Sequence, residues 1–238
     1  GATYLWTIPG TAGVNYNVIS GINSNSVTVQ WLTSGTRTIS ITETAGLCTA
    51  TANYLVNVTT KPTPAISRVG GGNLNQACMD DVVSYSTAGT GNQFVWAVTG
   101  GTITAGQGTS QITVNWTAVG NQTVTVTETA TANTACVGTS SVNVSVEERP
   151  NPVITGGTPV CSGTTQTYSV TAVPGHTYNW TISGTAADRT IVSSTTGNSV
   201  TVTWNNASTY TVSVTQTNVT GNCSASASLN VQVQFTPT

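Results

Sequence analysis

Hydrophobic and polar residues alternate with a period of two along every informative segment of this chain. One such segment alternates valine with threonine: Thr123, Val124, Thr125, Val126 and Thr127. Because successive side chains of a strand point to opposite faces, strict alternation indicates half-buried β-strands. The pattern places the valines in a core, and it places the threonines, which favour strands, on the solvent face. No window shows the spacing of an amphipathic helix.

Between residues 62 and 149 the alternation predicts seven strands, separated by turn clusters such as Gly106-Gln107-Gly108 and Gly89-Thr90-Gly91-Asn92. The predicted strands cover residues 64–69, 82–87, 93–99, 101–104, 110–117, 121–130 and 139–147. Seven short strands in so few residues are typical of two packed antiparallel sheets. The expected fold class is therefore all-β, with immunoglobulin-like antiparallel β-sandwiches in a linear array.

Three sequence motifs each occur three times along the chain. Two of them are Tyr/Phe-x-Trp-x-Ile/Val and Ser/Gln-Ile/Val-Thr-Val-x-Trp, and together they contain six tryptophans: Trp6, Trp31, Trp96, Trp116, Trp180 and Trp204. The second tryptophan and a later cysteine both recur at intervals of 85 to 88 residues. Independent landmarks that share one period indicate an array of similar units.

Two proline-containing segments mark the boundaries between units: Lys61-Pro62-Thr63-Pro64 and Arg149-Pro150-Asn151-Pro152. Such segments favour an extended backbone and lack amide donors, so they end a sheet and form short, semi-rigid spacers. We expect unit one at residues 1–61, as an incomplete repeat without its N-terminal strands. Unit two covers residues 62–149. Unit three covers residues 150–238 and ends in a further spacer at Phe235-Thr236-Pro237-Thr238.

Five cysteines follow the same division. Units two and three each contain two, at Cys78 and Cys136 and at Cys161 and Cys223, whereas unit one contains only Cys48. We expect two disulfides within units, Cys78–Cys136 and Cys161–Cys223, with Cys48 left unpaired because truncation removed its partner. Disulfides imply an oxidising, extracellular setting. Free buried thiols in a cytosolic protein are the alternative.

Charged side chains are scarce, and this excludes several classes of function. The 238 residues include 5 Lys and Arg and 7 Asp and Glu, for a net charge of −2. Without a basic cluster we expect no nucleic-acid partner and no binding to anionic lipid. No apolar run approaches the ~20 residues of a membrane span, so no membrane insertion is expected. We also expect no enzymatic activity and no cofactor.

The six tryptophans and the single histidine are the first candidates for a binding site. Each tryptophan of the second motif shares its strand face with Val or Ile, as Trp116 does with Ile112 and Val114. This parity predicts core packing rather than a sugar-stacking platform. His176 lies in a predicted turn and aligns with Ala2 and Asn92, so the repeat does not require a histidine there.

The carboxylates offer one candidate metal site. Glu147 and Glu148 directly precede the second spacer, where a calcium ion could rigidify a joint. Calcium needs six to eight oxygen ligands, however, and adjacent residues on a strand point apart. The same applies to Asp80 and Asp81, so a solvated strand edge is the favoured interpretation. A third set aligns at one strand end, where we expect it to bind loop amides: Glu43, Glu128 and Gln216.

The two tryptophan motifs and the late cysteine resemble the PKD-like, immunoglobulin-like repeats of large secreted surface proteins in Bacteroidota. The resemblance covers all three units. It departs from the PKD domain proper, where Trp-Asp-Phe-Gly-Asp-Gly follows the first tryptophan motif, because here Trp96-Ala97-Val98-Thr99-Gly100 stands instead. The resemblance implies a cell-surface or secreted protein of the gliding-motility adhesin or type IX secretion cargo type.

These observations predict a non-catalytic structural or adhesive segment that acts as a semi-rigid stalk. Its expected partners are neighbouring repeats of the same chain, and surface glycans or other cell-surface proteins are further candidates. The alternative is an accessory polysaccharide-binding module of a secreted multidomain enzyme, which would recognise its ligand through loops at one end of a unit.

Overall fold

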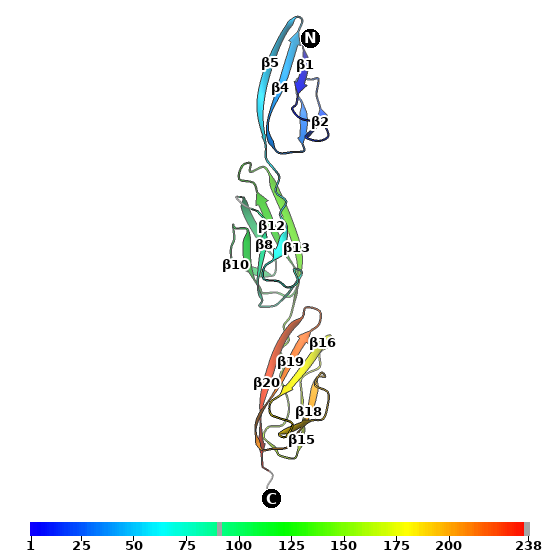
Figure 1. Cartoon of the computed structure of the whole chain (residues 1–238), viewed down its shortest axis with the longest axis vertical. Coiled ribbons are helices and arrows are strands. Elements are labelled where there is room, and N and C mark those ends of the chain that lie inside the picture. The colour runs from blue at the N-terminus through cyan, green and yellow to red at the C-terminus, as the bar shows by residue number, and fades with distance from the viewer. Residues whose placement is uncertain (90–91, 236–238) are drawn as a thin grey trace.

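The computed structural model describes residues 1–89 and 92–235, and in these residues every regular element is a strand (Figure 1). The last residues of the predicted third spacer, 236–238, and residues 90 and 91 of the predicted turn lie outside the described residues. The described parts contain no helix that could cross a membrane. The prediction of an all-β fold is confirmed.

Unit one has five strands: β1 (Thr3–Thr7), β2 (Tyr16–Ser20), β3 (Thr28–Trp31), β4 (Gly35–Ala45) and β5 (Cys48–Val58). Unit two has eight in its described residues: β6 (Ile66–Arg68), β7 (Gln76–Cys78), β8 (Val82–Thr87), β9 (Gln93–Val98), β10 (Gly101–Ala105), β11 (Gln111–Trp116), β12 (Gly120–Thr129) and β13 (Val137–Glu147). The described part of unit three has seven: β14 (Val160–Cys161), β15 (Thr165–Ser169), β16 (His176–Ile182), β17 (Arg189–Ile191), β18 (Ser199–Trp204), β19 (Ser208–Asn218) and β20 (Cys223–Gln234).

Unit two is a sandwich of two four-stranded sheets, ordered β10-β11-β8-β6 and β7-β13-β12-β9. Both sheets contribute to one core, in which Trp96 and Trp116 are buried together with Val124 and Val126. The threonines between these valines are partly exposed, as the alternation predicts. All seven predicted strands of this unit are present, and each predicted strand end lies within two residues of the observed one. The sequence pattern missed β7, a three-residue strand.

Unit three repeats this arrangement with sheets ordered β14-β20-β19-β16 and β15-β18-β17. Trp204 is fully buried between two tyrosines: its ring stacks on Tyr210 at a centroid distance of 4.9 Å, and Tyr168 meets it edge-on at 6.3 Å. The Trp204 indole N–H donates to the Tyr168 hydroxyl, which in turn donates to the Gly157 carbonyl. Burial raises the pKa of Tyr168. Its hydroxyl therefore stays protonated and continues to donate.

Unit one is smaller, with a three-stranded sheet β1-β4-β5 and the hairpin β2-β3. It contains no counterpart of β8 or β15, the strands that carry the tyrosine packed edge-on against the second tryptophan in the other two units. Trp6 and Trp31 are therefore only partly buried, which corrects the expectation that all six tryptophans form closed cores. Tyr16 from β2 and the Arg37 guanidinium, 5.4 Å from the ring centre, contact Trp31 instead.

The three units follow one another in a line, with the two termini at opposite ends of the molecule (Figure 1). Each sheet draws its strands from a single unit. The spacers are packed down at the joints rather than looped out, since Pro62, Pro150 and Pro152 are buried. At Gly138 the spacer backbone approaches so closely that a Cβ atom would lie 2.1 Å from the Pro62 carbonyl oxygen.

The difference in burial between Trp204 and Trp31 gives a direct test of the core. We expect Trp204→Ala to lower the free energy of unfolding of its unit by about 3–5 kcal/mol, because it leaves a large cavity. Trp31→Ala removes a half-exposed ring, and we expect a loss below about 2 kcal/mol. Urea unfolding followed by circular dichroism measures both. Equal losses would contradict the assignment of Trp31 to an open core.

Candidate functional site

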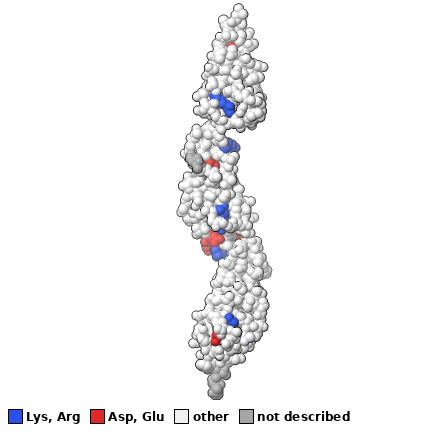
Figure 2. Space-filling view, in the orientation of Figure 1, with Lys and Arg blue, Asp and Glu red and all other residues white. Residues whose placement is uncertain are grey.

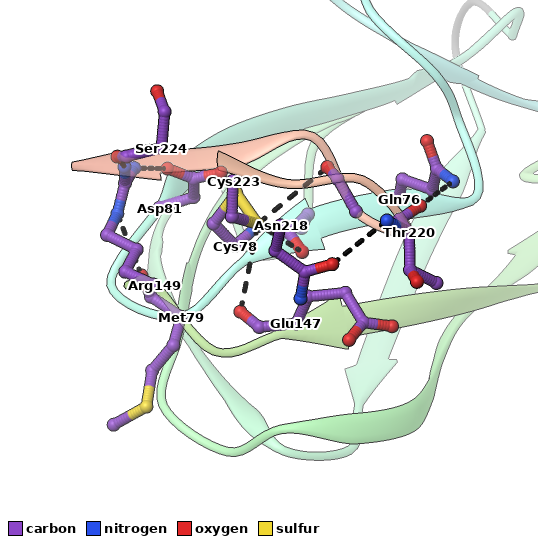
Figure 3. Close-up of a disulfide and its surroundings, with 12 residues drawn as sticks. Gln76, Cys78, Met79, Asp81, Glu147, Arg149, Asn218, Thr220, Cys223 and Ser224 are labelled. Carbon is purple, nitrogen blue, oxygen red and sulfur yellow. Dashed lines mark hydrogen bonds and ion pairs between the residues drawn. A yellow bond between two sulfur atoms is a disulfide. The ribbon is translucent and has the colours of Figure 1, made fainter. Parts of the chain in front are cut away.

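A disulfide joins unit two to unit three, and it defines the candidate site. Cys78, at the end of β7, is bonded to Cys223, at the start of β20, with a Cα–Cα distance of 5.7 Å (Figure 3). The predicted pairs Cys78–Cys136 and Cys161–Cys223 are therefore wrong. Cys48, Cys136 and Cys161 are free thiols.

The length of the last strand explains why the predicted pairs cannot form. In unit two, Cys136 directly precedes β13, whereas Cys78 lies opposite Glu147 at the other end of that strand. Eleven strand residues span about 35 Å, and a disulfide needs its Cα atoms within about 7 Å. In unit three, Cys223 and Cys161 lie at opposite ends of β20 in the same way.

A tight turn positions Cys78 at the lower end of unit two. The Asp81 N–H donates to the Cys78 carbonyl at 3.0 Å, and the Cys78 N–H donates to the Asp81 carboxylate at 2.8 Å. Asp80 takes a left-handed backbone conformation, with φ of 66°, which closes the turn. The turn is tied to the sheets on both sides, because Met79 donates to Glu147 and Asp80 donates to Trp116.

The β19–β20 hairpin of unit three brings Cys223 to the joint. The hairpin pairs Asn218 with Cys223, and the Asn218 side chain accepts the Thr220 N–H at 2.9 Å. Gly221 packs against unit two so closely that a Cβ atom would lie 2.3 Å from the Glu147 Cγ. Its backbone is not left-handed, so glycine is needed here for space rather than for conformation. The bonded sulfur of Cys223 is fully buried.

Arg149 is the second link across the joint. Its guanidinium forms an ion pair with Asp81 and donates to the Met79 carbonyl at 3.2 Å, both in unit two. The same group donates to the Ser224 carbonyl of unit three, also at 3.2 Å (Figure 3). A solvent-exposed ion pair contributes only about 0–1 kcal/mol. Arg149 therefore orients the joint that the disulfide holds.

Charged side chains gather around this joint, although they are scarce elsewhere (Figure 2). A third contact across it involves no charge: the Gln76 amide donates to the Thr220 carbonyl at 2.9 Å. The joint between units one and two is held differently. There the Cys136 thiol donates weakly to the Thr59 carbonyl at 3.8 Å, and the spacer packs on Gly138. The chain thus combines one covalently bridged joint with one that is only packed.

Glu147 and Glu148, the candidate calcium ligands for which a solvated strand edge is the favoured interpretation, lie beside this joint. Glu147 accepts a hydrogen bond from Ser145 at 2.9 Å and packs on Gly221. Asp81 is engaged by Arg149. Among the described residues, no three His, Cys, Asp or Glu side chains are grouped as metal ligands. The contacts that tie this joint together come from the disulfide, the Arg149 guanidinium and the Gln76 amide.

A groove of about 620 Å³ opens between units two and three, and it brings together several predicted candidates. Glu147, Glu148, His176 and Gln216 all line it. The Gln216 amide nitrogen lies 2.8 Å from His176 Nδ1, and Gln216 is buried. Glu128 makes the equivalent contact in unit two, where it accepts a hydrogen bond from the Asn92 amide at 2.6 Å. His176 thus occupies a structural position that Asn92 fills one repeat earlier.

In unit one, Glu43 occupies the position that aligns with Glu128 and Gln216, and it also has a hydrogen-bond partner. The Tyr4 hydroxyl donates to the Glu43 carboxylate at 3.4 Å. No described residue that lines the groove is Trp, Tyr or Phe. The groove therefore lacks the aromatic face on which a sugar ring stacks.

Sequence reasoning missed three residues of the joint: Gly221, Gln76 and the cross-joint role of Arg149. A usable signal was present. Cys136 directly precedes a strand that runs from one end of unit two to the other, so it lies at the opposite end of the unit from Cys78. A second signal was the charge of Asp81 and Arg149, in a chain that is otherwise almost uncharged.

Gly221 provides a test of how closely the two units approach. We expect Gly221→Ala to slow formation of the Cys78–Cys223 disulfide, because the new methyl group overlaps Glu147. Glu147→Gly in the same chain should restore the wild-type rate. Gly197→Ala is the matched control, since a Cβ there meets nothing closer than 3.8 Å. Thiol trapping during oxidative refolding measures the rates. Equal rates for the two alanine variants would contradict the close packing.

One family model matches part of the chain. The model of a family described as the PKD-like domain matches residues 146–231, which include most of unit three. No curated protein matches the chain.

Three solved structures are similar to the chain at low identity. Mouse cadherin-23 EC22-24 is 12% identical, with 99% of this chain and 86% of that chain covered and a TM-score of 0.32. The fibronectin(III)-like modules of Clostridium thermocellum CbhA are 10% identical, with coverages of 72% and 95% and a TM-score of 0.37. SGBP-B from the Bacteroides ovatus mixed-linkage glucan utilization locus is 14% identical, with coverages of 98% and 60% and a TM-score of 0.21.

These scores are too low to carry an argument about function. The strand order of the two complete sandwiches and the family match describe the same architecture. The chain folds as tandem PKD-like, immunoglobulin-type antiparallel β-sandwiches in a linear array.

Proposed function

We propose that this chain is a non-catalytic, semi-rigid stalk segment of a cell-surface or secreted filamentous protein, and that its bridged joint carries tension. The units we propose are residues 1–61, 62–149 and 150–238. The wider setting we propose is that of the gliding-motility adhesins and type IX secretion cargo of Bacteroidota. The observation that carries the proposal is the Cys78–Cys223 disulfide, which links the units rather than closing either of them.

The position of this disulfide determines the path of a force applied to the chain ends. Tension enters unit two at Pro62, follows β6 and β7 to Cys78, and crosses to Cys223. It then runs along β20 to Gln234. All residues between the two cysteines are bypassed, including the spacer at Pro150 and Pro152 and the cores around Trp116 and Trp204.

The position of the disulfide protects unit three most against unfolding under tension. β20 is a twelve-residue strand that runs from the joint to the lower end of the unit (Figure 1). A β-strand already rises about 3.3 Å per residue, close to the length of a fully extended chain. A strand that is already extended can lengthen very little under tension. Unit three can therefore transmit tension without unfolding.

Two further features support a rod of limited bending. Arg149 contacts both units at the bridged joint, and Gln76 adds a hydrogen bond to the hairpin of unit three. Pro62, Pro150 and Pro152 of the spacers are buried at the joints. A short spacer with fixed φ angles and packed side chains restricts the relative motion of its neighbours more than a Gly/Ser linker does.

A polysaccharide-binding module is the other function that we weighed. Four of the six tryptophans are buried in cores, and aromatic residues are absent from the described lining of the groove at the bridged joint. We therefore expect no retention of the chain on insoluble polysaccharides and no specific signal on a glycan array. Specific retention would favour the binding module.

Single-molecule stretching between the two termini tests the stalk. We expect the oxidised chain to extend less than the reduced chain by about 500 Å, which is the extended length of the 145-residue separation between Cys78 and Cys223. Cys223→Ser should match the reduced chain under oxidising conditions. Cys136→Ser is the control and should behave as the wild type. Equal extensions, with the disulfide verified by mass spectrometry, would contradict the proposed path of tension.

A further inference from the structure

We infer that Cys161 and Cys48 are the two halves of another joint of the Cys78–Cys223 type, so that two copies of this chain join head to tail through a Cys161–Cys48 disulfide. The inference rests on the proposed function only in that it treats the Cys78–Cys223 bridge as a joint between stalk units. The partner it assigns is a second copy of this chain. Both thiols are exposed and free in the structure.

The strand that carries Cys161 occupies the same place in unit three as the strand that carries Cys78 in unit two. β7 runs parallel to β13, with Cys78 opposite Glu147, and β14 runs parallel to β20, with Cys161 opposite Gln234. In both units this short strand lies at the edge of a four-stranded sheet, next to the last strand of the unit: the sheets are β7-β13-β12-β9 and β14-β20-β19-β16. Cys161 therefore lies at the lower pole of unit three, as Cys78 does in unit two.

The turn after Cys161 repeats the turn after Cys78, beginning with the first residue of each. The N–H of Ser162 donates to the Gln234 carbonyl at 2.8 Å, and the N–H of Met79 donates to the Glu147 carbonyl at the same distance. These bonds attach each turn to the end of the last strand of its unit.

The second residue of each turn also matches. Gly163 and Asp80 both have left-handed backbones, with φ of 81° and 66°. Their N–H groups donate to the carbonyls of Trp204 and Trp116, at 2.7 and 2.9 Å. Both turns thus have a left-handed residue at the same position, and in both it is bonded to the equivalent tryptophan. The two turns therefore have the same shape.

The third residue completes the match. Thr164 and Asp81 donate their N–H groups back to the carbonyls of Cys161 and Cys78, at 3.3 and 3.0 Å. Both also accept the N–H of the tryptophan, each at 3.0 Å. Cys161 is thus held in the backbone geometry that the bonded Cys78 has. The structure itself shows which partner that geometry receives: a cysteine at the start of the last strand of another unit.

Cys48 is the cysteine that fits this description at the other end of the chain. It begins β5 after the β4–β5 hairpin, as Cys223 begins β20 after the β19–β20 hairpin. Glycine stands two residues before each of them, at Gly46 and Gly221. In the bridged joint Gly221 provides the space for Glu147. Gly46 has open space around its Cβ position, and unlike Gly221 it has a left-handed backbone, with φ of 64°. Cys136 has Thr134 at the corresponding position.

Cys48 begins β5 in unit one and Cys161 ends β14 in unit three, and these are the two outer units of an elongated molecule (Figure 1). A contact between unlike surfaces at opposite ends is heterologous, and it produces open filaments rather than closed dimers. Each added copy would repeat the step from unit two to unit three. The two outer units thus present the complementary cysteines that this linear assembly needs.

The bond forms by thiol–disulfide exchange with a small disulfide oxidant such as oxidised glutathione. The thiolate of one cysteine attacks the oxidant to form a mixed disulfide, and one glutathione thiol leaves. The thiolate of the other cysteine then displaces the second glutathione. Two protein thiols lose two electrons and two protons, and one oxidised glutathione becomes two reduced molecules. Because no spacer peptide links the copies, a high protein concentration must replace the effective concentration of a tether.

The test is oxidation of the full chain at high concentration in a glutathione buffer, followed by non-reducing electrophoresis and peptide mapping. We expect a ladder of multimers that collapses on reduction, with Cys48–Cys161 as the peptide that links the copies. Cys136→Ser is the matched control and should give the same ladder. Cys161→Ser and Cys48→Ser should each remain monomeric alone. An equal mixture of these two variants should stop at the dimer.

Several results would overturn the inference. These are cross-links that map mainly to Cys136, symmetric Cys48–Cys48 or Cys161–Cys161 dimers, or a ladder that persists in either single variant. An oxidised chain that stays monomeric while Cys78–Cys223 is intact would also overturn it, and the proposed function would stand. Loss of Cys78–Cys223 itself in the peptide map would instead count against the proposed function.

Discussion

The length of the last strand in each unit determines how the rest of the molecule is connected. β13 and β20 run from one pole of a sandwich to the other, so a cysteine at the start of the strand, or directly before it, lies far from a residue paired with the strand's end. Cysteines of the same unit therefore cannot meet, whereas cysteines on either side of a joint lie next to each other. The hydrogen-bond register that closes the core also determines that the disulfide forms between units.

Because of this constraint, the residues that stabilise each unit differ from the residues that connect the units. The cores depend on buried tryptophan, tyrosine and valine, and they do not need a disulfide within the unit. The cysteines are then available to join units. The few charged groups take part in the same joint, where Arg149 contacts Asp81 on one side and Ser224 on the other. A chain with so few charges thus places several of them where orientation between units is decided.

The fold could be predicted from the sequence because it depends on patterns that repeat. Alternation gave the long strands, and the shared period of tryptophan and cysteine gave the array. The joint could not be predicted in the same way. β7 is three residues long, too short to show a period, and its parallel pairing with β13 depends on contacts distant in sequence. Without β7, the position of Cys78 was unknown, and pairing cysteines by unit was the simplest but incorrect choice. The exposure of Trp31 had a similar cause, since parity along a strand does not show whether a second sheet covers it.

The two joints of this chain differ in how a force would separate their units. Between units two and three, separation requires breaking a covalent bond, and the bypassed residues 79–222 stay slack while β20 carries tension. Between units one and two, tension runs through the peptide backbone, and the described residues there are held by packing on Gly138 and a weak contact from Cys136. A chain of units connected this way yields first at its unbridged joints. Its resistance to stretching is therefore set by how many of its joints carry the disulfide, more than by the stability of any one sandwich.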